Sequence, residues 1–166
     1  MAPATSGVLF VHSAPKALAP HVEWAIASTL GEVVQLDWVE QPVLPGSLRT
    51  DYTWHGNPGT AAALASALRG WEHLRFEITE DASLGTDPMR FLHTPDLGIF
   101  AAPTDAAGNM VVGEDRVRYA LEVSGGDFEE VQRELRLALG VAWDEELEPF
   151  RHAGETTSVV WLHRTG

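Results

Sequence analysis

The sequence predicts an α+β fold, and two patterns lead to this prediction. Apolar and polar residues alternate over several short segments, which is typical of strands with one buried face. Between these segments, apolar residues recur at helical spacing, and glycine or proline marks where each segment ends. A chain with both kinds of segment favours a fold in which helices pack on a mostly antiparallel sheet.

The first half of the chain contains the clearest elements. Its four predicted strands cover residues 8–11, 33–39, 48–54 and 73–79. One helix begins near Pro20 and ends at Gly31, because proline is tolerated in a first turn and glycine ends helices. A second helix begins at Asn57-Pro58 and runs through Trp71. The order β-α-β-β-α-β is that of ferredoxin-like domains, in which two helices cover one face of a four-stranded antiparallel sheet.

A second α/β half is expected to pack with the first. Strands are predicted at residues 90–93, 97–102 and 110–112, with a closing strand at 158–163. Asp127 and Glu130 have the spacing of a capping box and open a helix that ends at Gly140. A short acidic helix follows over residues 143–150.

Residues 114–123 fit two patterns. Val117, Tyr119, Leu121 and Val123 suit a strand, whereas Val117, Ala120 and Leu121 suit a helix. The acidic pair that opens the segment favours the helix, through its interaction with the helix dipole.

The length of 166 residues suits one compact domain, which we expect over residues 7–166 after a loose tail at 1–6. Within it, residues 7–80 and 90–165 form the two expected halves. The weak similarity of their strand–helix–glycine patterns also allows an internal duplication.

Composition excludes several classes of function. The formal charge of −13 opposes binding to nucleic acid or to anionic lipid. The absence of cysteine excludes disulfides, thiolate metal sites and a cysteine nucleophile. No apolar stretch approaches the roughly 20 residues that a membrane helix needs, and no secretory signal is recognisable. We therefore expect a cytoplasmic protein that binds neither nucleic acid nor membrane.

No recognised catalytic or cofactor motif is present. The turn after the first strand, where α/β proteins often place a site, reads His12-Ser13-Ala-Pro-Lys and lacks a phosphate-binding glycine pattern. Neighbouring residues on a strand point to opposite faces, so His12 and Ser13 are poorly placed as base and nucleophile. No two histidines have the spacing of a helical zinc site. We therefore predict no metal and no cofactor.

Several side chains remain candidates for ligand binding, among them His12, Ser13, His93 and Asp96. Tyr52 and Trp54 share a strand face that the pattern assigns to the core, so core packing is the favoured use of Trp54 and a ligand groove is the alternative. Trp24 departs from the apolar stripe of its helix, which makes it a candidate for a partner surface. Arg151 is a candidate anion ligand; alternatively, it forms a bidentate pair with a carboxylate and fixes the C-terminal segment. His93 with Asp96 is a candidate acid/base pair.

Long stretches of the chain resemble an uncharacterised actinobacterial family, domain of unknown function 3145. These stretches include Val8-Leu-Phe-Val-His-Ser-Ala-Pro, Leu64-Ala-Ser-Ala-Leu-Arg-Gly-Trp, Thr94-Pro-Asp-Leu-Gly-Ile-Phe and Trp143-Asp-Glu-Glu-Leu-Glu-Pro-Phe-Arg, and the resemblance runs from residue 7 to 163. It implies no catalytic residue or cofactor. It suggests an accessory role in fatty-acid or acyl-carrier metabolism, and it favours the helix at 114–123.

Two functional hypotheses follow. In the first, the chain is a non-catalytic binding or regulatory protein that holds a small molecule or a protein partner on a sheet face or in a cleft between the halves. In the second, it is a small hydrolase or acyl-group enzyme that uses His12, or His93 with Asp96, as acid and base.

Overall fold

The computed structural model describes residues 4–152, which form one six-stranded antiparallel sheet, five α-helices and a short 3-10 turn. The strands are β1 (Thr5–Pro15), β2 (Val39–Glu40), β3 (Ser47–Gly56), β4 (Arg75–Glu80), β5 (Met89–Thr94) and β6 (Gly98–Pro103). The helices are α1 (Ala19–Leu30), α2 (Thr60–Leu68), α3 (Glu114–Val123), α4 (Phe128–Ala138) and α5 (Val141–His152), with the 3-10 turn at Lys16–Leu18. The predicted α+β class is confirmed.

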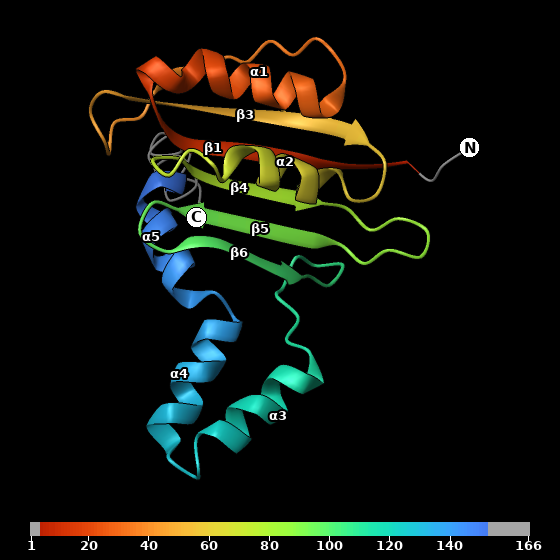
Figure 1. Cartoon of the computed structure of the whole chain (residues 1–166), viewed down its shortest axis with the longest axis vertical. Helices are drawn as coiled ribbons and strands as arrows, with labels where there is room; N and C mark the ends of the chain where they lie inside the picture. Colours follow the sequence, from red (N-terminus) through yellow and green to blue (C-terminus); the bar gives the residue numbers. More distant parts are fainter. Residues whose placement is uncertain (1–3, 153–166) are drawn as a thin grey trace, which may run out of the picture.

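The sheet is continuous across both parts of the chain. Its strands lie in the order β2-β3-β1-β4-β5-β6, and every neighbouring pair is antiparallel. The strands β5 and β6 extend the edge formed by β4, instead of building a sheet of their own (Figure 1).

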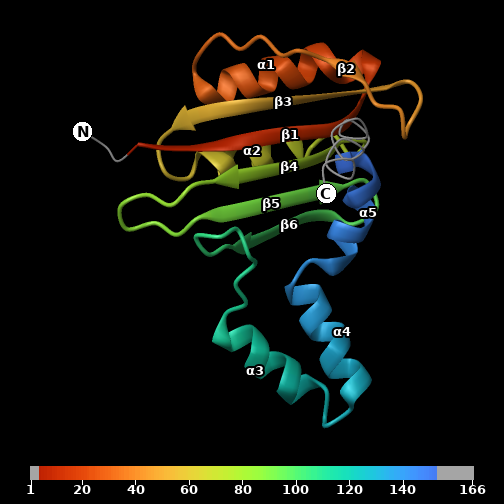
Figure 2. The same ribbon diagram turned by 180° about the vertical axis from the view of Figure 1, so that it is seen from behind.

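The helices occupy different sides of the sheet. The helices α1 and α2 lie together on one face (Figure 1), and α5 crosses one end of the opposite face (Figure 2). The pair α3 and α4 extends away from the sheet beyond β6. As a result, the face opposite α1 and α2 keeps an open area beside α5 (Figure 2).

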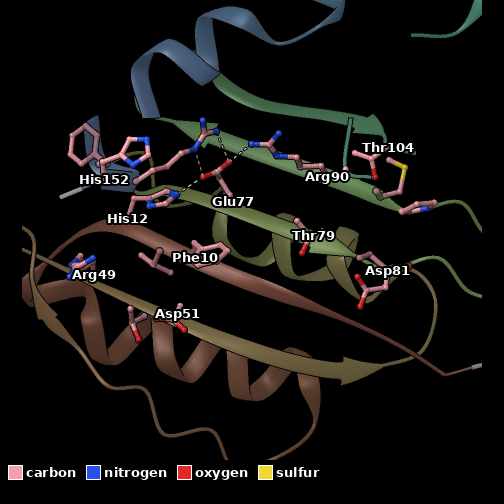
Figure 3. A pocket seen from close by; sticks show the side chains of 18 of the residues that line it. Phe10, His12, Arg49, Asp51, Glu77, Thr79, Asp81, Arg90, Thr104 and His152 are labelled. Carbon is pink, nitrogen blue, oxygen red and sulfur yellow. Dashed lines mark hydrogen bonds and ion pairs between the residues drawn. The ribbon is translucent and has the colours of Figure 1, made fainter. Parts of the chain in front are cut away.

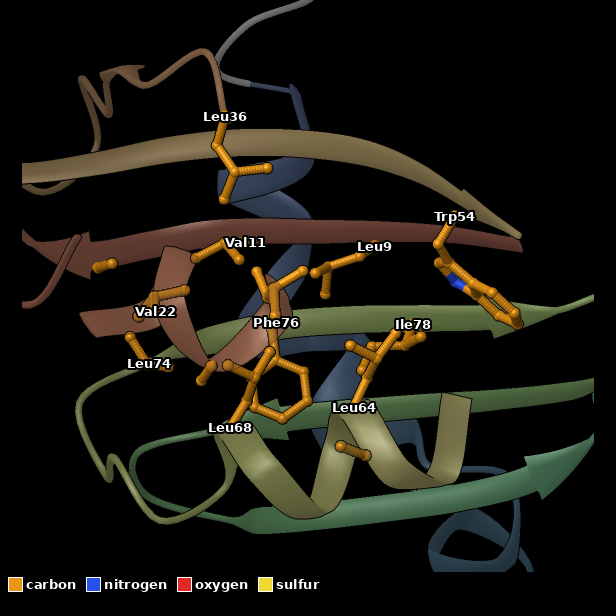
Figure 4. Packing of buried hydrophobic residues seen from close by; sticks show 14 of the residues in the cluster. Leu9, Val11, Val22, Leu36, Trp54, Leu64, Leu68, Leu74, Phe76 and Ile78 are labelled. Atoms are coloured by element: carbon orange, nitrogen blue, oxygen red, sulfur yellow. The ribbon is translucent and has the colours of Figure 1, made fainter. Parts of the chain in front are cut away.

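The core lies between the sheet and the helices α1 and α2. The alternation predicted from the sequence places Leu9 and Val11 of β1, with Phe76 and Ile78 of β4, on this face, and all four side chains are buried (Figure 4). Their alternate neighbours face the other way, so the polar side chains of the same strands gather on the open face.

Strand β1 contains a β-bulge near its C-terminal end. Its register with β4 shifts between Val11 and Ser13, and its register with β3 shifts between Val11 and Ala14. A bulge inserts an extra residue and redirects the side chains around it. Here the residue inside the bulge is His12, and its side chain lies on the open face (Figure 3).

The strand predicted at residues 33–39 is wrong except at its last residue. Only Val39 and Glu40 pair with β3, and Val33 is 98% exposed. The segment is extended because it packs on α1: the backbone N–H of Leu36 donates to Glu23. At residues 33–39, the alternation of apolar and polar residues therefore reflects contact with α1 and not pairing in the sheet.

Other boundaries also differ. The strand β1 begins at Thr5, two residues before the expected start of the domain, because the Thr5 hydroxyl donates to the carbonyl of Asp81. The helix predicted from Asn57 to Trp71 is shorter, since α2 covers Thr60–Leu68.

The second half of the chain agrees with most of its predicted elements. The strand expected at residues 110–112 is reduced to a single bridge between Thr104 and Met110. Residues 114–123 form a helix, as the acidic start favoured. Asp127 caps α4 by accepting from the backbone N–H of Glu129. The closing strand predicted at residues 158–163 lies outside the described residues.

Candidate functional site

A buried ion cluster lies on the open face of the sheet and centres on Glu77 of β4. Its Oε2 lies 2.5 Å from His12 Nε2 and 2.8 Å from Arg151 Nε, and its Oε1 lies 2.6 Å and 2.7 Å from the Nη2 atoms of Arg151 and Arg90 (Figure 3). The Glu77 side chain is 8% exposed. We call these four residues, His12, Glu77, Arg90 and Arg151, the Glu77 cluster.

Four separate elements supply the cluster, each for a local reason. Glu77 alternates with the buried residues Phe76 and Ile78 of β4, so it faces away from the core. Arg90 comes from the neighbouring strand β5, and Arg151 from the last turn of α5. The bulge in β1 contributes His12.

A second shell of carboxylates surrounds the arginines. Arg151 Nη2 lies 2.8 Å from Asp144 Oδ1, and Arg151 Nη1 donates to Glu148 at 3.1 Å. Arg90 Nη2 lies 3.5 Å from the same Asp144 oxygen. Each guanidinium is therefore neutralised by more than one carboxylate, which fixes its orientation.

The cluster controls the charge of its central carboxyl. Burial alone would raise the pKa of Glu77, but hydrogen bonds from His12, Arg151 and Arg90 lower this pKa well below its usual range. Burial would likewise lower the pKa of Arg151, but Glu77, Asp144 and Glu148 raise it. Glu77 is consequently ionised, and because a carboxylate only accepts, His12 Nε2 is the donor.

A large pocket opens over this face, with a cavity volume of about 1190 Å³. We call it the sheet-face pocket. Its floor comes from β1, β3, β4 and β5, and its walls include the end of α5 and the loop after β6. The Glu77 cluster lies at the α5 end of the pocket (Figure 3). Phe10, which is 40% exposed, contributes an apolar patch to the floor.

The Glu77 cluster is better suited to holding α5 on the sheet than to binding a metal ion. Among residues 4–152, no group of three or more histidine, aspartate or glutamate side chains is arranged to hold a metal ion. The Glu77 carboxylate is shared by one imidazole and two guanidinium groups, so its acceptor sites are already used.

Two of the candidates from the sequence belong to this site. His12 lines the sheet-face pocket and binds Glu77. Arg151 also lines it, and its Nε and Nη2 atoms reach the two different oxygens of Glu77. This is the bidentate carboxylate pair given as the structural alternative for Arg151. Ser13 lies next to the bulge, but its hydroxyl is buried and accepts from Arg75 at 3.3 Å.

The aromatic groove predicted at Tyr52 and Trp54 is not part of this site. Both side chains lie on the face covered by α1 and α2, which is the buried face of the alternating strand β3. Trp54 is fully buried in the core (Figure 4). The Tyr52 hydroxyl donates to Glu32, which follows α1.

The structure also separates His93 from Asp96. The ring of His93 is buried and stacks on Phe76 with centroids 4.9 Å apart, and its Nδ1 lies 2.7 Å from the carbonyl oxygen of Leu74. Burial lowers the pKa of this imidazole. Asp96 lies in the exposed turn between β5 and β6. His93 is therefore a packing residue on the helix-covered face.

Trp24 lies on the outer surface of α1 and is 71% exposed, as its position off the apolar stripe suggested. Its role as a partner surface stays a prediction.

Sequence reasoning missed Glu77 and Arg90. Both residues stand at polar positions of alternating strands, where a solvent-facing side chain is the ordinary expectation. The partners of Glu77 are distant in the sequence: His12 lies 65 positions before it and Arg151 lies 74 positions after it. The signals in the sequence were the position of His12 at the end of a buried strand and the expectation that Arg151 pairs with a carboxylate.

The comparisons with known proteins identify the family but no activity. The fold and the site define an α+β protein whose sheet has one open face, with a buried ion cluster at one end of a pocket on that face. The chain belongs to the family described as protein of unknown function (DUF3145), whose family model matches residues 8–164. Searches of curated proteins and of solved structures found no significant match. The described helices include none with the length and apolar character needed to cross a bilayer.

Proposed function

We propose that this protein is a non-catalytic binding or regulatory protein that holds a small molecule in the sheet-face pocket. The observation that carries the proposal is the Glu77 cluster at one end of a cavity of about 1190 Å³. Large concave sites that combine apolar patches with a few fixed polar groups are typical of ligand pockets.

The cluster supports binding because it is already organised. Its charged groups are held by one another, so a ligand meets side chains that need little reordering. The nearest hydroxyl nucleophile considered from the sequence, Ser13, is buried and occupied by Arg75. Both features favour a fixed binding surface over a reaction centre.

The arrangement of the first four strands agrees with this role. We propose that residues 7–80 form a ferredoxin-like unit, because β2-β3-β1-β4 is the order of that fold and both of its helices lie on one face. Such units serve as ligand-sensing modules in other proteins, which is support by analogy only. The chain's acidic, cysteine-free composition supports a cytoplasmic location.

A ligand screen tests the proposal. The unfolding midpoint of the full chain is measured with acyl-CoAs, nucleotides and amino acids, and each hit is titrated by calorimetry. The acyl-CoA arm also tests an accessory role in acyl metabolism. A ligand bound only by the folded state raises the midpoint, by an amount that grows with its concentration. We expect Phe10→Ala to weaken binding of a hit about fivefold or more, through loss of apolar contact area.

The control is Val33→Ala, which removes an exposed apolar side chain that does not line the sheet-face pocket. If no compound raises the midpoint, or if the two variants bind the hit equally well, the proposed function is wrong.

One contact favours an enzyme as the second candidate. The hydrogen bond between His12 and an ionised carboxylate orients the imidazole, as in general acid–base catalysis. In this alternative, His12 activates water for ester or thioester hydrolysis. Hydrolysis of p-nitrophenyl acetate and octanoate by the wild-type chain, lost in His12→Gln, would support it. Equal rates for both proteins would exclude it.

A further inference from the structure

The charged residues that line the sheet-face pocket fall into two groups. The first group consists of residues that already have a partner. The Glu77 cluster binds itself, Glu80 accepts from the start of α2, and Asp105 accepts from its own turn. Asp81 accepts from Ser6. These groups are held in place by partners within the protein, so they shape the pocket and have fewer free positions for contacts with a ligand.

The second group consists of Asp37, Arg49 and Asp51, for which no hydrogen bond or ion pair of the side chain occurs within residues 4–152. The Nε atom of Arg49 is also shielded from water without a hydrogen-bond partner. A buried donor without a partner costs free energy, and a ligand acceptor would recover it. Within the described part of the chain, the charged pocket residues without a side-chain partner are therefore one cation, Arg49, and two carboxylates, Asp37 and Asp51.

Two of these charges are placed as a pair. Arg49 and Asp51 are alternate residues of β3, so they lie on the same face, about 7 Å apart along the strand. Figure 3 shows both at the floor of the pocket. Their charged groups are not within ion-pair distance of each other, which leaves each one available to a ligand.

The neighbours of the pair are apolar. Phe10 of β1 lies directly opposite Asp51, and Val39 of β2 lies directly opposite Arg49. Both side chains line the pocket and are substantially exposed. A molecule bound between Arg49 and Asp51 would therefore place its remaining atoms against apolar surface.

From this arrangement, and resting on the proposed function, we propose that the ligand is a zwitterion of the α-amino acid class with an apolar side chain. Its carboxylate accepts from the Arg49 guanidinium, and its ammonium group donates to the Asp51 carboxylate. A simple anion would satisfy Arg49 but would be repelled by Asp37 and Asp51. A simple cation would leave the buried Nε of Arg49 without an acceptor.

Calorimetry on the full chain tests the proposal with L-leucine, L-methionine and L-phenylalanine. Each is compared with its amide, which lacks the carboxylate, and with its N-acetyl form, which lacks the ammonium group. We expect at least one free amino acid to bind, and both of its derivatives to bind about tenfold more weakly or less, since each loses one charge-assisted contact.

Two variants locate the contacts. Arg49→Gln and Asp51→Asn should each lower the affinity for that amino acid about tenfold. The matched controls Arg116→Gln and Asp115→Asn lie on the exposed surface of α3 and should bind as the wild type does. The unfolding midpoint of the unliganded Arg49→Gln protein should not fall, because this guanidinium has no partner to lose among the residues that the structure describes.

The outcomes separate this proposal from the proposed function. Equal binding of a derivative, or unchanged affinity in Asp51→Asn, overturns the zwitterion assignment. If none of the amino acids binds but another compound of the broader screen does, the assignment is wrong and the pocket keeps its binding role. If nothing binds in either experiment, both proposals fail.

Discussion

Replacing Glu77 by glutamine tests how strongly the buried cluster stabilises the fold. Glutamine keeps the shape of the side chain but removes the charge that compensates Arg90, Arg151 and the donor of His12. Removing one partner from a buried ion pair typically costs about 3–5 kcal/mol. The arginine side chains are 20% and 23% exposed, so solvent compensates part of the loss. We therefore expect the lower end, about 3 kcal/mol.

Urea unfolding followed by circular dichroism measures this loss. For a chain of this length, about 3 kcal/mol corresponds to a fall of about 6–12 °C in the thermal midpoint. Glu145→Gln is the control, because its ion pair with Arg136 is exposed on both sides and should contribute less than about 1 kcal/mol. If Glu77→Gln loses less than about 1 kcal/mol, the Glu77 cluster does not hold the fold together as we describe.

The same variant should change the dependence of stability on pH. The pKa of Glu77 is lowered in the native state relative to its ordinary value of about 4.5, so its contribution is complete above that pH. The contribution is lost as the pH falls below about 4.5, because the unfolded chain takes up a proton there and the native chain does not. The wild-type chain should lose stability over this range, and Glu77→Gln should lose less.

Two substitutions test the packing around β4. Gly7→Ala should destabilise the chain by more than about 2 kcal/mol, because a Cβ atom would lie 1.8 Å from the Thr79 carbonyl oxygen. Urea unfolding measures the loss, and Gly70→Ala, where a Cβ atom meets nothing within 4 Å, should be neutral or better. Glu80→Ala should cost about 1–2 kcal/mol, because the Glu80 carboxylate accepts from two backbone N–H groups at the start of α2. Faster hydrogen exchange confined to the first turn of α2 would confirm the cause, and unchanged exchange would contradict it.

The fold was predictable where local patterns and tertiary packing agree. The run at residues 8–11 and the alternation at residues 48–54 and 73–79 each produce a strand, because one face meets the core. The alternation at residues 33–39 wrongly predicted a strand of that length. Val34 and Leu36 of this segment are buried, but the segment pairs with no strand before Val39. Alternation indicates an extended backbone with one buried side, and it does not identify the neighbour.

The site was only partly predictable for a related reason. His12 attracted attention because it follows a buried strand, and Arg151 because it invited a carboxylate partner. The partner, Glu77, lies far from both in sequence, and nothing local distinguishes it from an ordinary solvent-facing glutamate. Trp54 lies in the core, which is the use that its strand pattern favoured, and it does not form the alternative ligand groove.

The long sequence separations within the Glu77 cluster have a consequence for folding. His12 and Arg151 approach Glu77 only when segments 65 and 74 residues long have closed into loops. Such distant contacts carry a large entropic cost and form slowly compared with local helices. We therefore expect the pocket wall at α5 to form late in folding, after the strands that supply His12 and Glu77 have paired. If the pocket binds a ligand as proposed, a partly folded chain that lacks this wall should bind it more weakly than the folded chain.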